Sequence, residues 1–563
     1  MNVSERRMRP GAIVRWQKSR GRVRVRFGEP GGRWYGVHRC LKCEAISYIL
    51  QLPPNFTSFM ATICVDVGTS VIKTVAFDDR GTEIAIARRE TEVLRPAPGF
   101  SEQDMPSVWK AAVSTIRTVV KQIREPVNLI SLTAQGDGCW LVDGEGRPTG
   151  PAILWNDARG AAIIDRWREA GVLNEAFRRN GSQTFAGLPN AIFTWLRHYD
   201  PDRLERSHKS LCCNGWIFYN LTGRMAVDES DASVPFFDVR ERRYSSELLK
   251  LYGLEWAERL LPEVLSNDRR VGELLSTAAV ELGLPAGLPV VMSPYDVAST
   301  AIGVGAVSDG QACSILGTTL CTEVVMNQVN LEREPSGLTI PFGPPGLYLR
   351  AFPTLAGAEV IHWTVRQLGL SGVSELSQLA TKAEPGADGL CFLPYFSPAG
   401  ERVPFLNTGA RGSLFGLSFE HGREHIARAV LEGLSLVIRD CLEASQEGPA
   451  PLSVCGLCGG GANSEVWCQL IADVIGARTS RPVDQEVGAK GAFIAGLVAV
   501  GKEADFSSAA KDFVRIRDVF EPDQDRHARY DELFEQFLAI RESILPVWKR
   551  MADDRSQRDR AAV

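Results

Sequence analysis

The chain has 563 residues, of which 44% are hydrophobic and 23% charged, and its formal net charge at pH 7 is −5. A chain of this length and ordinary composition predicts a globular protein of two or more domains. No apolar run is long enough to span a bilayer, and the 13 cysteines are scattered with no secretory signal ahead of them. These features argue against a membrane protein or a disulfide-rich secreted protein, and they predict a cytoplasmic protein with reduced thiols.

Residues 1–59 differ in charge from the rest of the chain. They contain 10 Arg and 2 Lys against 3 Glu, which gives a net charge of +9. Because the whole chain has a net charge of −5, the remaining residues carry a net charge of −14. A basic, Gly-rich segment without clear periodicity predicts a disordered extension. Such an extension could contact nucleic acid or anionic lipid, and a start codon assigned too far upstream would explain it as well.

A hairpin is predicted next, because two β-branched runs, 63–67 and 71–77, flank a short polar turn. The turn is Gly68-Thr69-Ser70, and Asp66 lies at the end of the first run. Backbone N–H groups and hydroxyls in such a turn suit a phosphate, and Asp66 could hold the hydrated Mg²⁺ of a nucleotide. The same small polar residues also suit an ordinary turn.

Two later strands lead into candidate substrate ligands. After an amphipathic helix predicted at 104–123, a buried strand at 129–134 runs into Gln135-Gly136-Asp137-Gly138, where flanking glycines leave the Asp137 carboxylate open to a ligand. A run at 151–155 leads to Asp157 and Arg159. These two residues either bind substrate or form an intrachain ion pair that orients a loop, and the sequence favours neither.

Four features mark the second half of the chain. A strand at 289–292 leads to Asp296 at the start of a helix, where position alone favours a capping role. A second turn of the same kind, Gly317-Thr318-Thr319, separates two β-like runs and supports phosphate binding by a duplicated fold. A strand at 452–457 precedes a glycine-rich loop, 459–464, that would let the backbone approach a flat ligand. Residues 496–503 resemble a P-loop but have Glu503 in place of the hydroxyl, so we predict a helix that ends at Gly501.

Motifs along most of the chain resemble the FGGY carbohydrate kinases. The N-terminal part contains Asp-x-Gly-Thr-Ser-x-x-Lys at 66–73, Gln-Gly-Asp-Gly at 135–138 and Ala-Ile-Leu-Trp-Asn-Asp-Ala-Arg at 152–159. The C-terminal part contains Glu401-Arg402-x-Pro404 and Gly412-Ser-Leu-Phe-Gly-Leu. The similarity extends from residue 61 to about 545. Asn190 departs from it, because most members have lysine there, and this loosens the inference about that loop.

The resemblance implies an α/β fold of the actin-like, ribonuclease H-like ATPase type shared by sugar kinases, Hsp70 and actin. It places a substrate domain at 60–303, a nucleotide domain at 304–545, a cleft between them and a charged tail at 546–563. Family members usually begin near Met60, so we favour the start-codon explanation for residues 1–59 and expect neither a nucleic-acid nor a membrane partner. Homodimers or homotetramers are usual in the family.

The resemblance also implies a role for each site residue. Asp296 becomes the catalytic base that accepts the substrate proton, and Asp66 binds Mg²⁺ through water. The substrate is expected to contact Gln135, Asp137, Asp157, Arg159 and Asp296, and ATP is expected to contact Gly68, Thr69, Ser70, Lys73, Gly317, Thr318, Thr319, Gly460, Gly461 and Asn463.

The loop at 135–138 most resembles family members that act on erythritol. A carboxylate accepts hydrogen bonds from hydroxyls and offers none to a carbonyl, so we expect ATP-dependent phosphorylation of a terminal hydroxyl of a short polyol such as erythritol. A pentulose such as xylulose, or glycerol, is the alternative substrate. An actin- or Hsp70-like ATPase and an inactive sugar sensor are more remote alternatives, since neither needs Asp137, Asp157 and Asp296 together.

Overall fold

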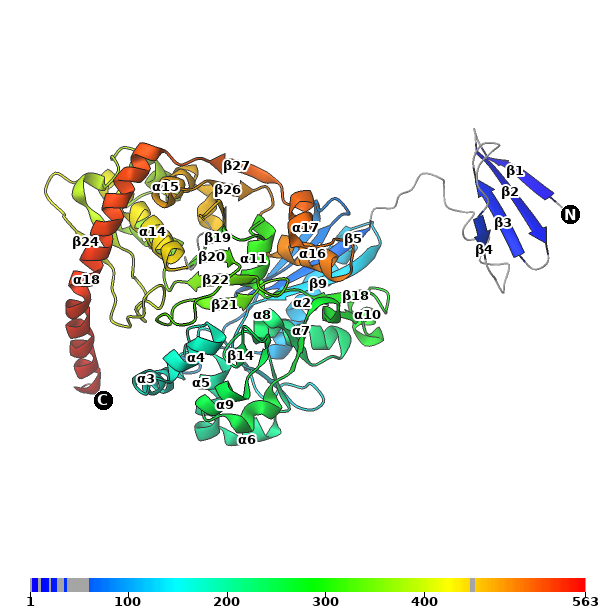
Figure 1. Cartoon of the computed structure of the whole chain (residues 1–563), viewed down its shortest axis with the longest axis horizontal. Coiled ribbons are helices and arrows are strands. Elements are labelled where there is room, and N and C mark those ends of the chain that lie inside the picture. The colour runs from blue at the N-terminus through cyan, green and yellow to red at the C-terminus, as the bar shows by residue number, and fades with distance from the viewer. Residues whose placement is uncertain are drawn as a thin grey trace. The chain divides into compact units, whose positions relative to one another are not determined.

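The computed structural model describes residues 60–445 and 451–561, together with four strands within residues 3–37 (Figure 1). The chain separates into two compact units, residues 1–59 and residues 60–563. Every element predicted to position the site belongs to the second unit. No helix among the described residues combines the length and apolar character needed to cross a membrane.

The first unit contains a sheet where the sequence analysis expected a disordered extension. Its strands pair antiparallel in the order β1 (Val3–Met8), β2 (Ala12–Ser19), β3 (Arg22–Phe27) and β4 (Tyr35–Val37). The correction has a sequence basis, because Arg and Val alternate over residues 22–26 with the period of two that is typical of strands.

Two mixed sheets organise the second unit, and both start from a hairpin followed by parallel strands. In the first sheet, β5 forms an antiparallel hairpin with β6 and runs parallel to β9, which runs parallel to β18. In the second, β19 forms a hairpin with β20 and runs parallel to β25, which runs parallel to β26. The strand order of the first sheet is β17 (Val271–Glu273), β18 (Pro289–Met292), β9 (Val127–Ala134), β5 (Ala61–Val67), β6 (Val71–Phe77) and β7 (Glu83–Glu90). The strand order of the second sheet is β21 (Leu338–Pro341), β22 (Tyr348–Pro353), β20 (Leu320–Met326), β19 (Gln311–Leu316), β25 (Val454–Cys458), β26 (Thr479–Pro482) and β27 (Ile516–Phe520).

This repeated topology is the duplication that the two Gly-Thr turns predict. One turn joins β5 to β6 and the other joins β19 to β20. The predicted helix at 104–123 is α2 (Met105–Gln122), and the Asp104 side chain caps it by accepting from the backbone N–H of Ser107 at 2.9 Å. The P-loop-like segment is the end of α16 (Val487–Ala499), and Gly501 follows it with a φ of 72°.

In each half, the helix that follows the last parallel strand packs against the sheet of the other half. Helix α11 (Asp296–Val304) follows β18 of the first sheet yet contacts β19 and β25 of the second, whereas α16 follows β26 of the second sheet and contacts β5, β9 and β6 of the first. In Figure 1 the orange α16 accordingly lies beside the blue β5. The two helices pack closely, since a Cβ on Gly491 would lie 1.7 Å from the Ser299 carbonyl oxygen.

Polar contacts fix α16 on the first sheet. The hydroxyl of Ser131 in β9 donates to the Ala492 carbonyl at 2.6 Å, and that of Ser293 donates to the same oxygen at 3.3 Å. One hydrophobic cluster includes buried residues of β5, α11, β19 and α16. The core therefore continues from one half into the other.

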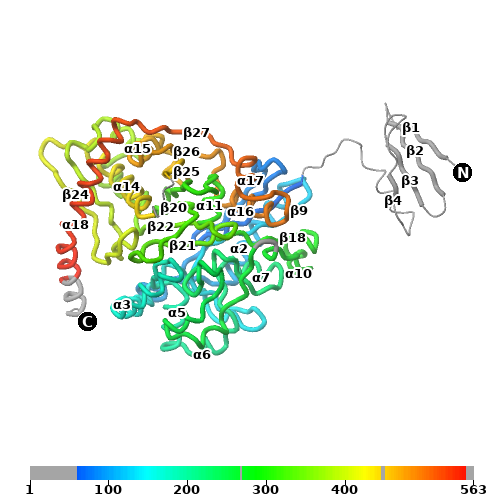
Figure 2. The backbone as a smooth tube through the Cα atoms, in the orientation of Figure 1, coloured from blue at the N-terminus to red at the C-terminus, as the bar shows by residue number. Residues whose placement is uncertain are grey.

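The remaining elements surround this centre. A helical lobe packs on its own cluster beside the first sheet, and α14, α15 and α18 cover the second domain, with α18 along its edge (Figure 2). They are β8 (Glu102–Gln103), β10 (Trp140–Val142), β11 (Ala152–Ile153), α3 (Ala161–Glu169), α4 (Val172–Asn180), α5 (Pro189–Tyr199), α6 (Pro201–Arg206), β12 (Lys209–Leu211), α7 (Cys213–Thr222), β13 (Ala226–Asp228), α8 (Glu229–Ala232), β14 (Phe237–Asp238), β15 (Arg243–Tyr244), α9 (Ser246–Leu251), β16 (Glu263–Leu265), α10 (Ser276–Leu282), α12 (Ala358–Gln367), α13 (Val373–Ala380), β23 (Cys391–Leu393), β24 (Ser413–Phe415), α14 (Arg423–Ser445), α15 (Glu465–Ile475), α17 (Phe506–Phe513) and α18 (Gln524–Ala561).

Candidate active site

The first Gly-Thr turn is braced from within its own domain. The Thr69 hydroxyl donates to Gln135 Oε1 at 2.8 Å and accepts from the Trp155 indole N–H at 3.1 Å. Gln135 Nε2 donates in turn to Gln103 Oε1 at 2.8 Å, and Gln103 Nε2 donates to the Thr69 carbonyl at 2.7 Å. Both polar atoms of the Gln135 amide are thus engaged in holding the turn. Gly68 and Ser70 lie on either side of Thr69, and Ser70 is exposed.

Asp66 and Lys73 face each other across the hairpin. The Lys73 ammonium lies 4.0 Å from the Asp66 carboxylate and 2.9 Å from the carboxylate of Glu486, which immediately precedes α16. Arg88 of β7 contacts the same Glu486 carboxylate at 2.5 Å. Burial raises the pKa of Asp66 to about 6, with Lys73 opposing that rise. The sequence analysis did not identify Glu486, which lies more than 400 residues from its partner Lys73.

Asp66 and Thr300 present side-chain oxygens beside Gly488. A Cβ placed on Gly488 would lie 3.3 Å from Asp66 Oδ2 and 3.6 Å from the Thr300 hydroxyl oxygen, so the glycine leaves both oxygens uncovered on that side. Oxygen ligands and a partly hydrated shell are what Mg²⁺ prefers. The residues present therefore fit the predicted role of Asp66.

Asp296 is the first residue of α11 and belongs to a group of half-buried acids. Its carboxylate accepts from the backbone N–H of Val297 at 2.8 Å. Burial raises the pKa of Asp296 to about 8, and the negative charges of Asp66 and Asp137 push it in the same direction. A carboxyl with a raised pKa in a cleft is typical of groups that exchange protons. Asp66 and Asp137 thus lie near enough to Asp296 for their negative charges to raise its pKa.

Asp137 has an unusual backbone conformation at the end of β9. Its φ is 57°, in the left-handed region that non-glycine residues seldom adopt, which is typical of functional sites. A Cβ on the preceding Gly136 would lie 2.3 Å from the Tyr295 ring, so glycine is required for this ring to pack there. Burial raises the pKa of Asp137 to about 6, and Arg402 lowers it.

Asp157 and Arg159 form the ion pair that the sequence left as one of two alternatives. Arg159 Nε and Nη2 each donate to Asp157 at 2.9 Å, and the Ser101 backbone N–H donates to Asp157 at 2.7 Å. Arg159 also contacts Glu102 at 2.6 Å. The side chains of Asp157 and Arg159 are 0% and 3% exposed, respectively. These contacts favour the structural alternative over direct substrate binding.

The second Gly-Thr turn lines a pocket of about 1080 Å³. The pocket also receives the loop after β25 and residues of α12 and α13, including His362 and Ser377. Thr318 is exposed, in contrast to the braced Thr69. Five residues expected to contact ATP line this pocket: Gly317, Thr318, Gly460, Gly461 and Asn463. Thr319 follows Thr318 in the turn, outside the residues that line the pocket.

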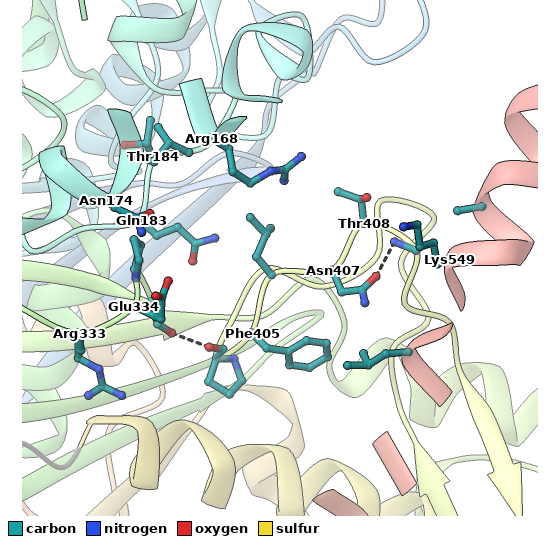
Figure 3. Close-up of a pocket in the computed structure, with 18 of the residues that line it drawn as sticks. Arg168, Asn174, Gln183, Thr184, Arg333, Glu334, Phe405, Asn407, Thr408 and Lys549 are labelled. Carbon is teal, nitrogen blue, oxygen red and sulfur yellow. Dashed lines mark hydrogen bonds between the residues drawn. The ribbon is translucent and has the colours of Figure 1, made fainter. Parts of the chain in front are cut away.

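Arg402 is a site residue that the sequence reasoning missed. Its Nε donates to the Pro353 carbonyl at 2.7 Å, and its guanidinium lies 5.6 Å from the Trp155 ring centroid and 5.1 Å from that of Phe185. The chain continues into loop 404–409, which borders a separate hollow of about 1090 Å³ between the two domains (Figure 3). None of the predicted site residues lines that hollow. The only signal for Arg402 was its place in the Glu-Arg-x-Pro motif.

The fold and the shared acid cluster define a two-domain α/β phosphotransferase. Sequence models of the FGGY family of carbohydrate kinases match residues 61–303 (N-terminal domain) and 312–500 (C-terminal domain). Erythritol kinase from Brucella abortus is 30% identical over 87% of this chain and 97% of that protein. Xylulose kinase from Escherichia coli is 30% identical over 86% and 99%. The crystal structure of gluconate kinase from Lactobacillus acidophilus matches 88% of this chain and 100% of its own, with a TM-score of 0.83 at 22% identity, which supports the fold.

The chain belongs to the FGGY family of carbohydrate kinases. It is accordingly an ATP-using kinase of a sugar or polyol. The predicted actin-like, two-domain fold is confirmed.

Proposed function

We propose that this kinase transfers the γ-phosphoryl group of Mg²⁺-ATP to a terminal hydroxyl of a short polyol, with erythritol as the first candidate. The observation that carries the proposal is the cluster of Asp66, Asp137 and Asp296, in which each acid has a distinct setting. Asp296 lies at a helix start with a raised pKa, Asp137 lies on a strained loop, and Asp66 presents a carboxylate oxygen beside Gly488.

Each acid then has one task in phosphoryl transfer. Asp296 accepts the proton of the attacking hydroxyl, and Asp137 accepts a hydrogen bond from a hydroxyl that does not react. Mg²⁺ held near Asp66 would supply positive charge that offsets the phosphate oxygens. The pocket that contains Thr318 and Gly460 is expected to hold the nucleotide, and Lys73 lies between Asp66 and Glu486, where it can neutralise charge.

A pentulose is the second candidate, because the Arg402 guanidinium lies over the Trp155 ring and is near enough to Asp137 to lower the pKa of that carboxyl. A guanidinium can donate to a ketose carbonyl, which a carboxylate cannot do. The named relatives include both an erythritol kinase and a xylulose kinase at 30% identity. Asp137 alone therefore does not decide between a polyol and a ketose.

The test is a coupled ADP-release screen over glycerol, erythritol, threitol, ribitol, xylitol, D- and L-xylulose and ribulose. We expect erythritol to give the highest kcat/KM. A ketopentose that exceeds every polyol by more than about tenfold, or ~1.4 kcal/mol of transition-state binding, would reject the erythritol assignment. ADP release that no added acceptor increases would reject the kinase mechanism proposed for these residues.

A further inference from the structure

The turn between β18 and α11 leads to Asp296, and two buried hydroxyls from other elements bind its backbone. The Thr133 hydroxyl of β9 donates to the Pro294 carbonyl at 2.8 Å. The backbone N–H of Tyr295 donates to the Ser230 hydroxyl oxygen of α8 at 3.0 Å. This second bond lies one residue before Asp296, so Ser230 holds the backbone immediately ahead of the proposed base.

Asp228 fixes the direction of the Ser230 hydroxyl. The hydroxyl oxygen of Ser230 lies 2.8 and 2.9 Å from the two carboxylate oxygens of Asp228, to which it donates. The same carboxylate caps α8 by accepting from the backbone N–H groups of Ser230 and Asp231 at 3.2 and 3.1 Å. A hydroxyl has one proton to donate, so its lone pairs are left to accept from the Tyr295 N–H. Asp228 and Ser230 are 3% and 2% exposed, which keeps solvent away from these bonds.

Tyr295 connects this arrangement to the strand end that carries Asp137. A Cβ on Gly136 would lie 2.3 Å from the Tyr295 ring, so the ring packs directly against the backbone next to Asp137. The same residue immediately precedes Asp296 at the start of α11. Tyr295 therefore lies between the segments that carry Asp137 and Asp296, and a shift of its backbone would move the two acids relative to each other.

Phosphoryl transfer depends mainly on position, because the base must lie within hydrogen-bond reach of the attacking hydroxyl. The Asp296 carboxylate accepts from the backbone N–H of Val297 at 2.8 Å, but Val297 belongs to the same helix. That bond moves with α11 and cannot fix the helix relative to the substrate loop. The bond between Tyr295 and Ser230 joins the start of α11 to a different element, so it can do so.

We infer that Ser230 and Asp228 are positioning residues for Asp296, acting through the backbone N–H of Tyr295. The inference rests on the proposed function, because it requires Asp296 to be the base. Both side chains bind protein atoms and are not assigned a contact with the acceptor or the nucleotide. Loss of the Ser230 hydroxyl is therefore expected to displace the base without removing a binding contact.

Ser230→Ala tests the inference, because it leaves the Tyr295 N–H without its acceptor. Steady-state assays measure kcat and KM with the acceptor that the ADP-release screen ranks first. We expect kcat to fall about tenfold, less than for a removed base, since the carboxylate remains but is displaced. The KM values for the acceptor and for ATP should stay within about twofold, because no binding contact is lost.

A double-mutant cycle shows whether Ser230 acts through Asp296. The Asp296→Asn variant has no base left to position, so adding Ser230→Ala should lower its remaining kcat by less than about twofold. A loss of about tenfold in both backgrounds would mean that Ser230 acts independently of Asp296. That result would overturn the inference.

Ser207→Ala is the matched control, because Ser207 is also a buried serine of the first domain with two hydrogen bonds. Its hydroxyl donates to the Arg203 carbonyl at 2.7 Å and bonds the Thr149 hydroxyl at 2.8 Å, and Ser207 is 2% exposed. Both variants should lower the melting temperature to a similar extent, but Ser207→Ala should keep the wild-type kcat. The same kcat in both variants would contradict a positioning role.

The outcomes separate this inference from the proposed function. If the wild-type protein releases ADP with no added acceptor preferred, or if Asp296→Asn keeps near wild-type turnover, the proposed base is wrong and the positioning role falls with it. If Asp296→Asn is impaired while Ser230→Ala is not, the positioning role alone is wrong.

A second variant keeps the test decisive if Ser230→Ala does not fold. Asp228→Asn retains one oxygen that can accept from the α8 backbone, but it presents an amide N–H beside the Ser230 hydroxyl and so weakens the order of that hydroxyl. We expect kcat to fall about threefold or more, and this loss should disappear in the Asp296→Asn background. Wild-type kcat in Asp228→Asn would then overturn the inference.

Discussion

The two Gly-Thr turns occupy equivalent places in their sheets but have different surroundings. Thr69 in the first turn is bonded to Gln135 and Trp155, whereas Thr318 in the second is exposed in a pocket of about 1080 Å³. Two residues before the glycine, the first hairpin has Asp66 and the second has Ile315. The duplicated fold thus holds the first turn by hydrogen bonds from its own domain and leaves the second turn open to a pocket.

The largest expected effect comes from Asp296, at the start of the helix that the two halves share. Asp296→Asn keeps the size of the side chain but cannot accept a proton, so kcat should fall about 10² to 10⁴-fold, with a smaller change in KM for the polyol. Wild-type kcat/KM should rise as the pH increases towards about 8, because the raised pKa keeps this base protonated at lower pH.

The control for Asp296 is Asp309→Asn, which removes an exposed acid and should retain wild-type kinetics. Steady-state assays from pH 5.5 to 9.5 measure both effects. Near wild-type turnover in Asp296→Asn would remove this residue from the role of base.

The second prediction concerns the free energy of unfolding, to which the buried Asp157–Arg159 ion pair of the first domain contributes. Asp157→Asn leaves the Arg159 guanidinium buried with weaker compensation and is expected to lower the free energy of unfolding by ~3 kcal/mol. Glu102→Gln removes the other partner of Arg159, at a side chain 12% exposed, and should cost less. Urea denaturation measures both. A stable Asp157→Asn that has instead lost polyol affinity would favour the substrate-binding alternative.

The third prediction tests the contrast between the turns directly. Thr69→Ala leaves Gln135 Oε1 and the Trp155 N–H without a partner, so it should destabilise the protein by ~1–3 kcal/mol while the KM for ATP stays within about twofold. Thr318→Ala should leave the melting temperature unchanged and raise the KM for ATP about fivefold, the size of one lost hydrogen bond. Identical behaviour of the two variants would mean that the turns have the same task.

The smallest effect is expected at Glu323 in β20. This side chain is fully buried, both carboxylate oxygens lack a hydrogen-bond partner in the described chain, and burial raises its pKa well above 4.5. Because the folded state holds this proton more tightly than the unfolded chain, stability is lost as the pH rises above about 4.5 towards the raised pKa. Glu323→Gln should melt like wild type at pH 5 and about 2 °C higher at pH 9. A lower melting temperature at both pH values would contradict this.

The sequence predicted features that depend on local chemistry. The β-branched runs around Gly68 and Gly317, the cap at Asp104 and the helix starting at Asp296 are each encoded within a few neighbouring residues. Long-range pairing was not predictable in the same way. Glu486 and Arg402 reach the site from distant segments, and only the assembled fold brings them to Lys73 and Asp137.

Other differences have local causes that the sequence did not resolve. Asp157 and Arg159 are two residues apart, a spacing that permits either a mutual ion pair or a joint ligand contact. Gln135 was expected to bind substrate, but its amide holds the Thr69 turn. Residues 22–27 form β3, although the high charge and lack of clear periodicity of residues 1–59 had predicted a disordered extension.

The exchanged helices α11 and α16 limit how this enzyme can be divided. A cut after residue 303 would leave the first sheet without α16, exposing the apolar surface near Cys64 and Val75, and would separate the hydroxyls of Ser131 and Ser293 from the Ala492 carbonyl. Neither half is therefore an independent folding module, although each contains a complete sheet. A chimaera with a related kinase would have to transfer α16 together with the first half, so recombination at the linear domain boundary would mismatch the helix pair on which the two halves meet.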